Sequence, residues 1–151
     1  MRYCTRRRPQ VDRCASAWLL KRFVDPEAAF AFVEEGDQVR GAIPFDISGT
    51  ELGHHRGRCT FEAILRKHKL KDPALVELGR IVRSADLLDA EETLEGPGLD
   101  LLFRGLLHLS QDDHQVLALA EPILDALHAA LQERHASRAA RSRRITPHRR
   151  R

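Results

Sequence analysis

Apolar residues in the first half of the chain follow two different spacings. Within residues 10–24 they recur at the spacing of a helix with one buried face. Short apolar runs at residues 30–33 and 42–47 instead predict buried strands, and residues 3–5 have the composition of a third short strand. Strands separated by a helix predict a small sheet of the α/β class.

The second half of the chain has helical spacing almost throughout. Helices are predicted from Cys59 or Thr60 for about three turns, from Asp72-Pro73 to about Asp86, over residues 99–109, and beyond a break at residues 110–113. Asp followed by Pro is typical of a helix start, because aspartate caps free amide groups and proline fits the first turn. We therefore expect an α/β fold, with a small sheet and flanking helices first and a helical C-terminal part after it.

The net charge of +3 conceals two regions of opposite charge. Seven arginines contribute +7 near the end of the chain, so residues 1–137 carry a net charge of −4. Apolar residues nearly vanish there, and we expect a domain over residues 1–136 and a disordered arginine-rich tail over residues 137–151. Such a tail could make weak contacts with nucleic acid. The seven arginines are Arg138, Arg141, Arg143, Arg144, Arg149, Arg150 and Arg151.

No stretch of the chain stays apolar over the roughly 18 residues that a membrane-spanning helix needs. The arginine-rich start also has no apolar core of the signal-peptide type, so we expect a cytoplasmic protein without membrane contact. The three cysteines, Cys4, Cys14 and Cys59, are an odd number at spacings that match no zinc ribbon. They are expected to be free thiols.

Several residues that could bind a metal or take part in catalysis lie within residues 45–62. An apolar run ends at Asp46, a glycine-rich turn carries His54, and a helical pattern follows. Asp12 in the first helix and Asp86 at the end of a later one can reach the same edge of a sheet in an α/β fold. Carboxylate and imidazole groups suit a divalent ion such as manganese, iron or zinc. The sequence thus predicts a metal held by Asp12, Asp46, His54 and Asp86.

These residues could also have purely structural roles. Asp12 can simply complement the dipole of its helix, and adjacent His54 and His55 can form a polar surface loop. Two adjacent histidines rarely reach one metal, so His55 would either support a metal ligand from behind or act as a proton carrier. In a catalytic version of the site, His55 or Glu62 would act as the general base.

Four arginines near the same segments predict an anion site beside the metal. Guanidinium groups bind tetrahedral dianions through paired, charge-assisted hydrogen bonds, and phosphate, sulfate and chromate share that shape and charge. We therefore expect a small oxyanion as a partner. The four candidates are Arg8, Arg13, Arg56 and Arg58.

Several segments resemble the ChrB-type chromate resistance domain. The resemblance extends over most of residues 3–132 and implies a standalone, stress-related domain that takes part in chromate sensing or detoxification. It also makes reduction of chromate by a thiolate of Cys14 or Cys59 a hypothesis. The matching segments are residues 5–28, 43–47, 51–62, 81–86 and 112–114.

A second, more distant similarity is to DHH-type phosphoesterases, which depend on manganese. The order Asp12, Asp46, His54 and Asp86 is similar to their motif order and implies a DHH-like N-terminal half. Gly53 replaces the aspartate of the DHH triplet, so the similarity implies at most one metal. A single-metal phosphoester hydrolase is therefore one alternative function. The other is a non-catalytic nucleic-acid interaction module that uses the basic tail.

Overall fold

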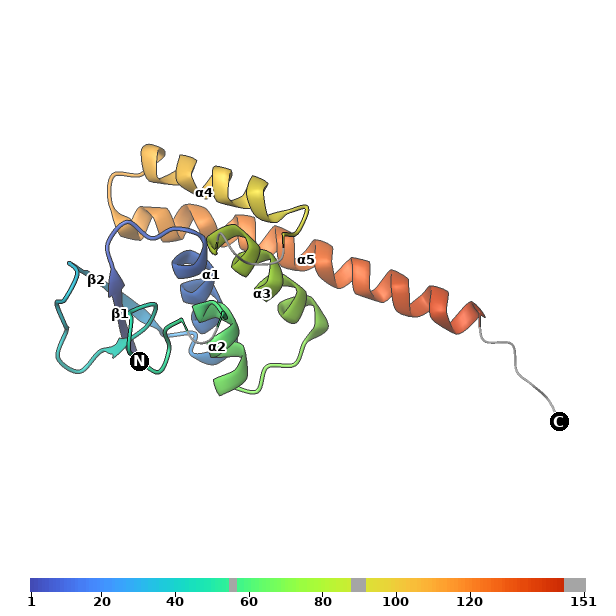
Figure 1. Ribbon diagram of the computed structural model, residues 1–151, viewed down its shortest axis with the longest axis horizontal. Coiled ribbons are helices and arrows are strands. Elements are labelled where there is room, and N and C mark those ends of the chain that lie inside the picture. Colours follow the sequence, from blue (N-terminus) through green and yellow to red (C-terminus); the bar gives the residue numbers. More distant parts are fainter. Residues whose placement is uncertain (55–56, 88–91, 146–151) are drawn as a thin grey trace.

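The computed structural model describes residues 1–54, 57–87 and 92–145. A three-stranded parallel sheet has the order β2-β1-β3, with β1 (Arg2–Arg6) in the middle, β2 (Ala29–Val33) on one side and β3 (Ile43–Pro44) on the other (Figure 1). The two runs that predict β1 and β2 are confirmed. The predicted strand over residues 42–47 shrinks to two residues, because Asp46 takes a left-handed backbone conformation with a φ of 50°.

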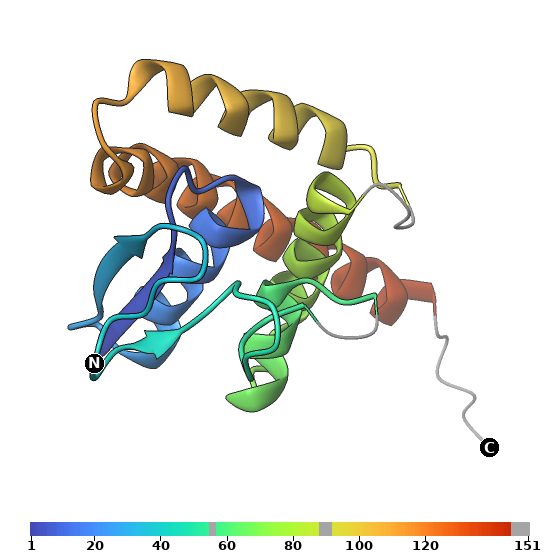
Figure 2. The ribbon, with the colours of Figure 1, turned by 60° about the vertical axis from the view of Figure 1, so that its left-hand side comes forward.

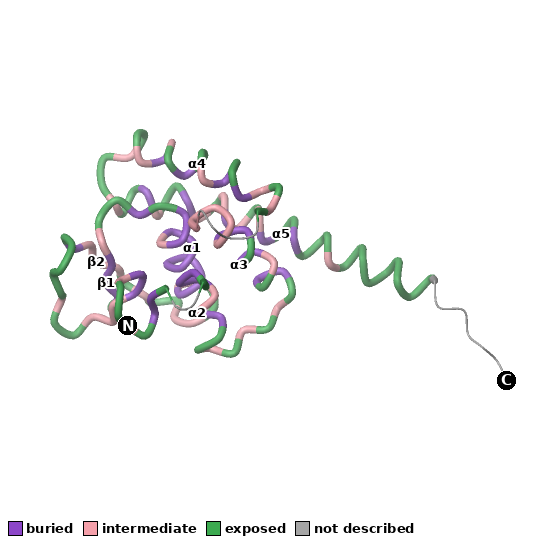
Figure 3. Tube along the Cα trace, in the orientation of Figure 1, coloured by how far each residue is buried: buried purple, intermediate pink, exposed green. Residues whose placement is uncertain are grey.

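Helix α1 (Val11–Leu19) forms the centre of the molecule. It continues as the π-helical turn η1 (Leu20–Val24), so the predicted helix over residues 10–24 is confirmed. In two views α1 lies between the sheet and α3 (Pro73–Asp86) (Figures 1 and 2), and almost all of its residues are buried (Figure 3). The ring of Trp18 stacks on Phe61 with centroids 6.5 Å apart and meets His128 edge-on. Every face of α1 therefore needs apolar or satisfied polar groups.

Three more helices complete the fold as the sequence predicts. They are α2 (Thr60–Lys67), α4 (Gly96–Leu109) and α5 (Asp113–Ile145). The side chain of Asp72 accepts a hydrogen bond of 2.8 Å from the amide of Ala74, so it caps α3. The architecture is mixed α/β with a small parallel sheet and a helical C-terminal part, which confirms the expected fold class. None of the described helices is both long and apolar enough to span a membrane.

The expected disordered tail differs from the structure over residues 137–145, which continue α5. Arginine and alanine are good helix formers, so the loss of apolar residues does not end the helix. Just before this stretch, Arg134 anchors α5 through ion pairs of 2.7 Å to Glu77 and 2.8 Å to Glu95. The last described turns project from the domain with exposed side chains (Figures 1 and 3). Residues 146–151 lie outside the described part of the chain.

Two helical glycines give a matched test of the packing between α2 and α3. Alanine favours a helix over glycine by about 0.5–1 kcal/mol. At Gly105 an added Cβ meets no described atom within 4 Å, so Gly105→Ala should raise the free energy of unfolding by that amount. At Gly79 the Cβ would lie 3.2 Å from Cγ of Glu62 and 3.3 Å from Cδ1 of the fully buried Phe61. Overpacking costs about 1–3 kcal/mol, so Gly79→Ala should lower stability.

Denaturant unfolding of both variants measures the two effects against wild type. An equal gain in the two variants would contradict the close approach of α2 to α3.

Candidate functional site

Asp12 joins the first helix to the start of α2. It is 1% exposed, and its carboxylate accepts hydrogen bonds from the amides of Thr60 (2.7 Å, to Oδ2) and Phe61 (2.9 Å, to Oδ1). The hydroxyl of Ser16, one turn further along α1, donates a third bond of 3.2 Å to Oδ1. The free amides and dipole of a helix N-terminus stabilise a carboxylate. Asp12 is therefore held in one orientation by both helices.

Asp46 is held next to Asp12 from the other side. Nε of Arg13 donates a hydrogen bond of 2.6 Å to its Oδ2, and Oγ1 of Thr60 donates one of 3.1 Å to its Oδ1. Arg6 lies further away, with Nη2 3.9 Å from Oδ2. The left-handed backbone of Asp46 is uncommon for a residue with a side chain, and such conformations cluster at functional sites. The loop after β3 thus turns this carboxylate back toward α1.

Three carboxylates converge on one nitrogen of His54. Nε2 of His54 lies 2.9 Å from Oδ1 of Asp46, 3.0 Å from Oδ2 of Asp12 and 3.5 Å from Oδ2 of Asp86. The ring nitrogen carries at most one proton, so it can donate only one good hydrogen bond at a time. The imidazole is 40% exposed, whereas the side chains of Asp12 and Asp46 are nearly inaccessible. The cluster therefore has more negative charge than one imidazolium ion and Arg13 neutralise.

The charges in this cluster shift the protonation of its members. Hydrogen bonds to Asp12 and then to Asp46 raise the pKa of His54 to about 10. Burial, followed by repulsion from Asp12 and Asp46, raises the pKa of Asp86 to about 6. Burial also favours the neutral form of Asp46, but hydrogen bonds from His54 and Arg13 outweigh it and lower its pKa. In metal-free protein the imidazolium of His54 therefore acts, together with Arg13, as a counter-ion of the carboxylates.

The same atoms fit a divalent metal. Oδ2 of Asp12, Oδ1 of Asp46 and Nε2 of His54 offer one ligand atom each, and residues 12, 46 and 54 form a group whose ligand atoms lie within 4.8 Å of one another. A metal about 2.1 Å from its ligands keeps neighbouring octahedral ligands about 3.0 Å apart, close to the distances from His54 to Asp12 and Asp46. Asp86 lies at the margin of this group. Mixed oxygen and nitrogen ligands suit manganese, iron or zinc.

The structure brings together all four of the predicted metal ligands, Asp12, Asp46, His54 and Asp86. It also reveals two contributors that sequence reasoning missed. Thr60 donates to both aspartates through its amide and hydroxyl groups, and Ser16 donates to Asp12. The spacing of four between residues 12 and 16 could have indicated Ser16, because such residues share a helix face.

The other predicted site residues lie in different surroundings. Oε2 of Glu62 accepts a bond of 3.3 Å from the amide of Cys59, and its Oε1 pairs with Arg83 at 3.1 Å, so Glu62 caps α2. This arrangement leaves little of Glu62 available as a general base. The candidates His55 and Arg56 lie outside the described residues.

The described arginine candidates separate in space. Arg13 uses Nε for Asp46 and Nη1 for the carbonyl of Arg7 at 2.9 Å, so it positions the site. Arg8 lies beside α5, where its amide donates to Oδ1 of Asp113 at 3.1 Å. Arg58 is exposed on a groove between α2 and α3. They do not form one anion pocket at the metal cluster.

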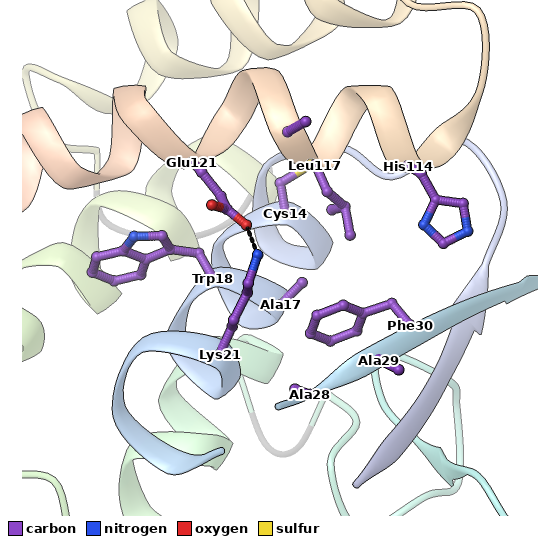
Figure 4. Close-up of a pocket in the computed structure, with 11 residues that line it drawn as sticks. Cys14, Ala17, Trp18, Lys21, Ala28, Ala29, Phe30, His114, Leu117 and Glu121 are labelled. Carbon is purple, nitrogen blue, oxygen red and sulfur yellow. Dashed lines mark hydrogen bonds and ion pairs between the residues drawn. The ribbon is translucent and has the colours of Figure 1, made fainter. Parts of the chain in front are cut away.

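The cysteines do not have the environment of reactive thiolates. Cys14 borders a cavity of about 360 Å³ between α1, β2 and α5, and an ion pair of 2.6 Å joins two other lining residues, Lys21 and Glu121 (Figure 4). Burial raises the pKa of the Cys14 thiol, and burial followed by the charge of Asp12 raises that of Cys59. Thiolate chemistry needs a lowered pKa and access. The surroundings of these two thiols therefore do not support chromate reduction at Cys14 or Cys59, which stays a hypothesis.

The raised pKa of His54 predicts a pH dependence for metal-free protein. An imidazole with a folded-state pKa near 10 and an ordinary value of 6.5 contributes stability that is complete below about pH 6.5. That stability is lost as the pH rises toward 10, while Asp86 stays ionised. In chelator, the difference in melting temperature between wild type and His54→Gln should shrink from pH 7 to pH 10. A constant difference would contradict the ion-pair cluster.

Comparisons with known proteins identify a family and a relative that this chain resembles. A family model described as the C-terminal domain of ChrB matches residues 3–131. Protein ChrB of Cupriavidus metallidurans (strain CH34) is 31% identical over 128 residues, which cover 83% of this chain and 39% of that protein. The chain thus spans well under half the length of that relative. No solved structure matches this chain. The likeness to DHH-type phosphoesterases stays a prediction. The chain belongs to the ChrB C-terminal domain family.

Proposed function

We propose that this domain binds one divalent metal ion at Asp12, Asp46 and His54. The observation that carries the proposal is the convergence of three carboxylates on Nε2 of His54, at 2.9, 3.0 and 3.5 Å. Histidine and aspartate are oriented before any ion arrives, because the amides of α2, Thr60 and Arg13 already hold the carboxylates. Such preorganisation lowers the cost of binding.

The metal would complete the charge balance of the cluster. A divalent ion replaces the proton of His54, and the neutral imidazole then offers its lone pair as a ligand. Asp86 can bind the ion directly or through water, since its Oδ2 is the most distant of the three oxygens. The exposed side of His54 leaves a direction from which an anion could approach. When bound, the metal supplies a positive centre that attracts oxyanions.

We further propose a role in chromate resistance, as the family suggests. The oxyanion would bind at the metal, because Arg8 and Arg58 lie elsewhere and Arg13 is engaged with Asp46. Chromate, sulfate and phosphate all present the tetrahedral oxygens that such a centre accepts. Glu62 is occupied as the cap of α2, which removes one of the two candidate general bases for phosphoester hydrolysis, and we therefore favour binding and sensing.

Metal titration tests the first step. Wild-type protein freed of metal should bind about one manganese or zinc ion per chain, and Asp46→Asn should weaken the affinity at least about tenfold, because it removes a charged ligand. Asp86→Asn should have a smaller effect. Isothermal titration calorimetry, with elemental analysis of the dialysed protein, gives both affinity and stoichiometry.

Asp100→Asn is the charge-matched control, since Asp100 pairs with Arg104 on α4, away from the cluster. Asp12 is avoided as a test residue because its loss also frees two amides of α2. Equal affinities of wild type and Asp46→Asn would refute the metal site.

Oxyanion binding tests the second step. Chromate should raise the melting temperature of metal-loaded wild type, and this rise should vanish in chelator and in His54→Gln. Sulfate at excess should reduce the effect, because it has the same shape and charge. A chromate effect of equal size in metal-free protein would place the anion at another site and leave the metal result standing.

A further inference from the structure

We infer that the groove between α2 and α3 binds the phosphate backbone of a nucleic-acid duplex. The groove has a volume of about 610 Å³ and lies on the outer side of the two helices and their connection. Five cations line it, and all five are exposed. They are Arg58, Arg66, Lys69, Lys71 and Arg80.

No carboxylate among the described residues neutralises these five cations. None of the five forms an ion pair with a carboxylate within the described ranges 1–54, 57–87 and 92–145. The one acid in the groove, Glu62, is already paired with Arg83. The nearby Lys67 differs, because its ammonium pairs with Glu51 at 2.8 Å. Like charges gathered in a groove raise the local potential and attract a polyanion.

The described residues that line the groove include three apolar side chains, which do not form a long exposed stripe. Leu65 is 7% exposed, Leu70 is half-buried, and only Val76 is substantially exposed, at 38%. An acidic amphipathic helix or a lipid surface would need a wider apolar stripe to bury. The five exposed cations favour an electrostatic mode of binding, which is the mode of contact with a phosphate backbone.

The lack of aromatic side chains among the described residues of the groove favours a duplex over a single strand. The described residues that line the groove include no Phe, Tyr or Trp, so bases of a single strand would find no surface to stack on. A duplex presents evenly spaced phosphates without needing such contacts. Lysine and arginine contacts to phosphate carry no sequence information, so binding should not depend on the base sequence.

Fluorescence anisotropy with a labelled duplex of about 20 base pairs tests the inference on the full chain in chelator. Wild type should bind with an affinity that falls steeply with salt, with a slope of log K on log salt of about −4.5 if all five cations contact phosphate. Lys71→Gln/Arg80→Gln should weaken binding about tenfold and reduce the slope by about 2. A second duplex of unrelated sequence should bind equally well.

Arg2→Gln/Arg40→Gln removes the same charge at two exposed positions outside the groove, and should bind like wild type. Arg143→Gln/Arg144→Gln tests the end of α5 separately. The inference is overturned if the groove variant binds as well as wild type, if only the α5 variant weakens binding, or if polyglutamate or the single strand binds more tightly than the duplex. Because chelator removes metal from all samples, these outcomes are independent of the metal proposal.

Discussion

The carboxylate of Asp12 on the N-terminus of α2 is the constraint on which the site depends. Its two oxygens accept hydrogen bonds from the amides of Thr60 and Phe61, at 2.7 and 2.9 Å, and it is almost fully buried. These bonds fix the position of α2 against α1 and close the loop that carries His54. A buried carboxylate without such donors would cost several kcal/mol, so the charge and the two amides stabilise each other.

This double role explains how the protein's own hydrogen bonds hold the carboxylates of the cluster in place. Both oxygens of Asp12 accept hydrogen bonds from α2, and Oδ2 also lies close to Nε2 of His54. Oδ1 of Asp46 lies close to the same nitrogen, while Arg13 donates a hydrogen bond to Oδ2 of Asp46. Hydrogen bonds to a ligand carboxylate fix its direction and share its charge. The centre should therefore select an ion by geometry as well as by charge.

The sequence predicts the elements and the four metal candidates because both follow from local rules. Apolar spacing predicts α1 to α5, and residues at helix ends and after strands reach one edge of a parallel sheet. The hydrogen-bond and ion-pair partners of a side chain follow less directly from the local sequence. The pattern around Glu62 allows a base or a capping residue, and only its packing against Cys59 and Arg83 decides. The continuation of α5 was missed for a different reason, because apolar spacing ends there while arginine and alanine still favour a helix.

The dipole of α2 offers one physical reason why opposite charges gather at its two ends. Its N-terminus carries partial positive charge and lies on Asp12, close to the acidic cluster, while Arg66 and Lys67 occupy its last turn and Lys69 follows. Each arrangement is favoured by the helix independently of any ligand. The net charge of −4 for residues 1–137 hides this separation. A short helix can thus have acidic groups at its N-terminus and basic groups at its C-terminus without the two sets neutralising each other.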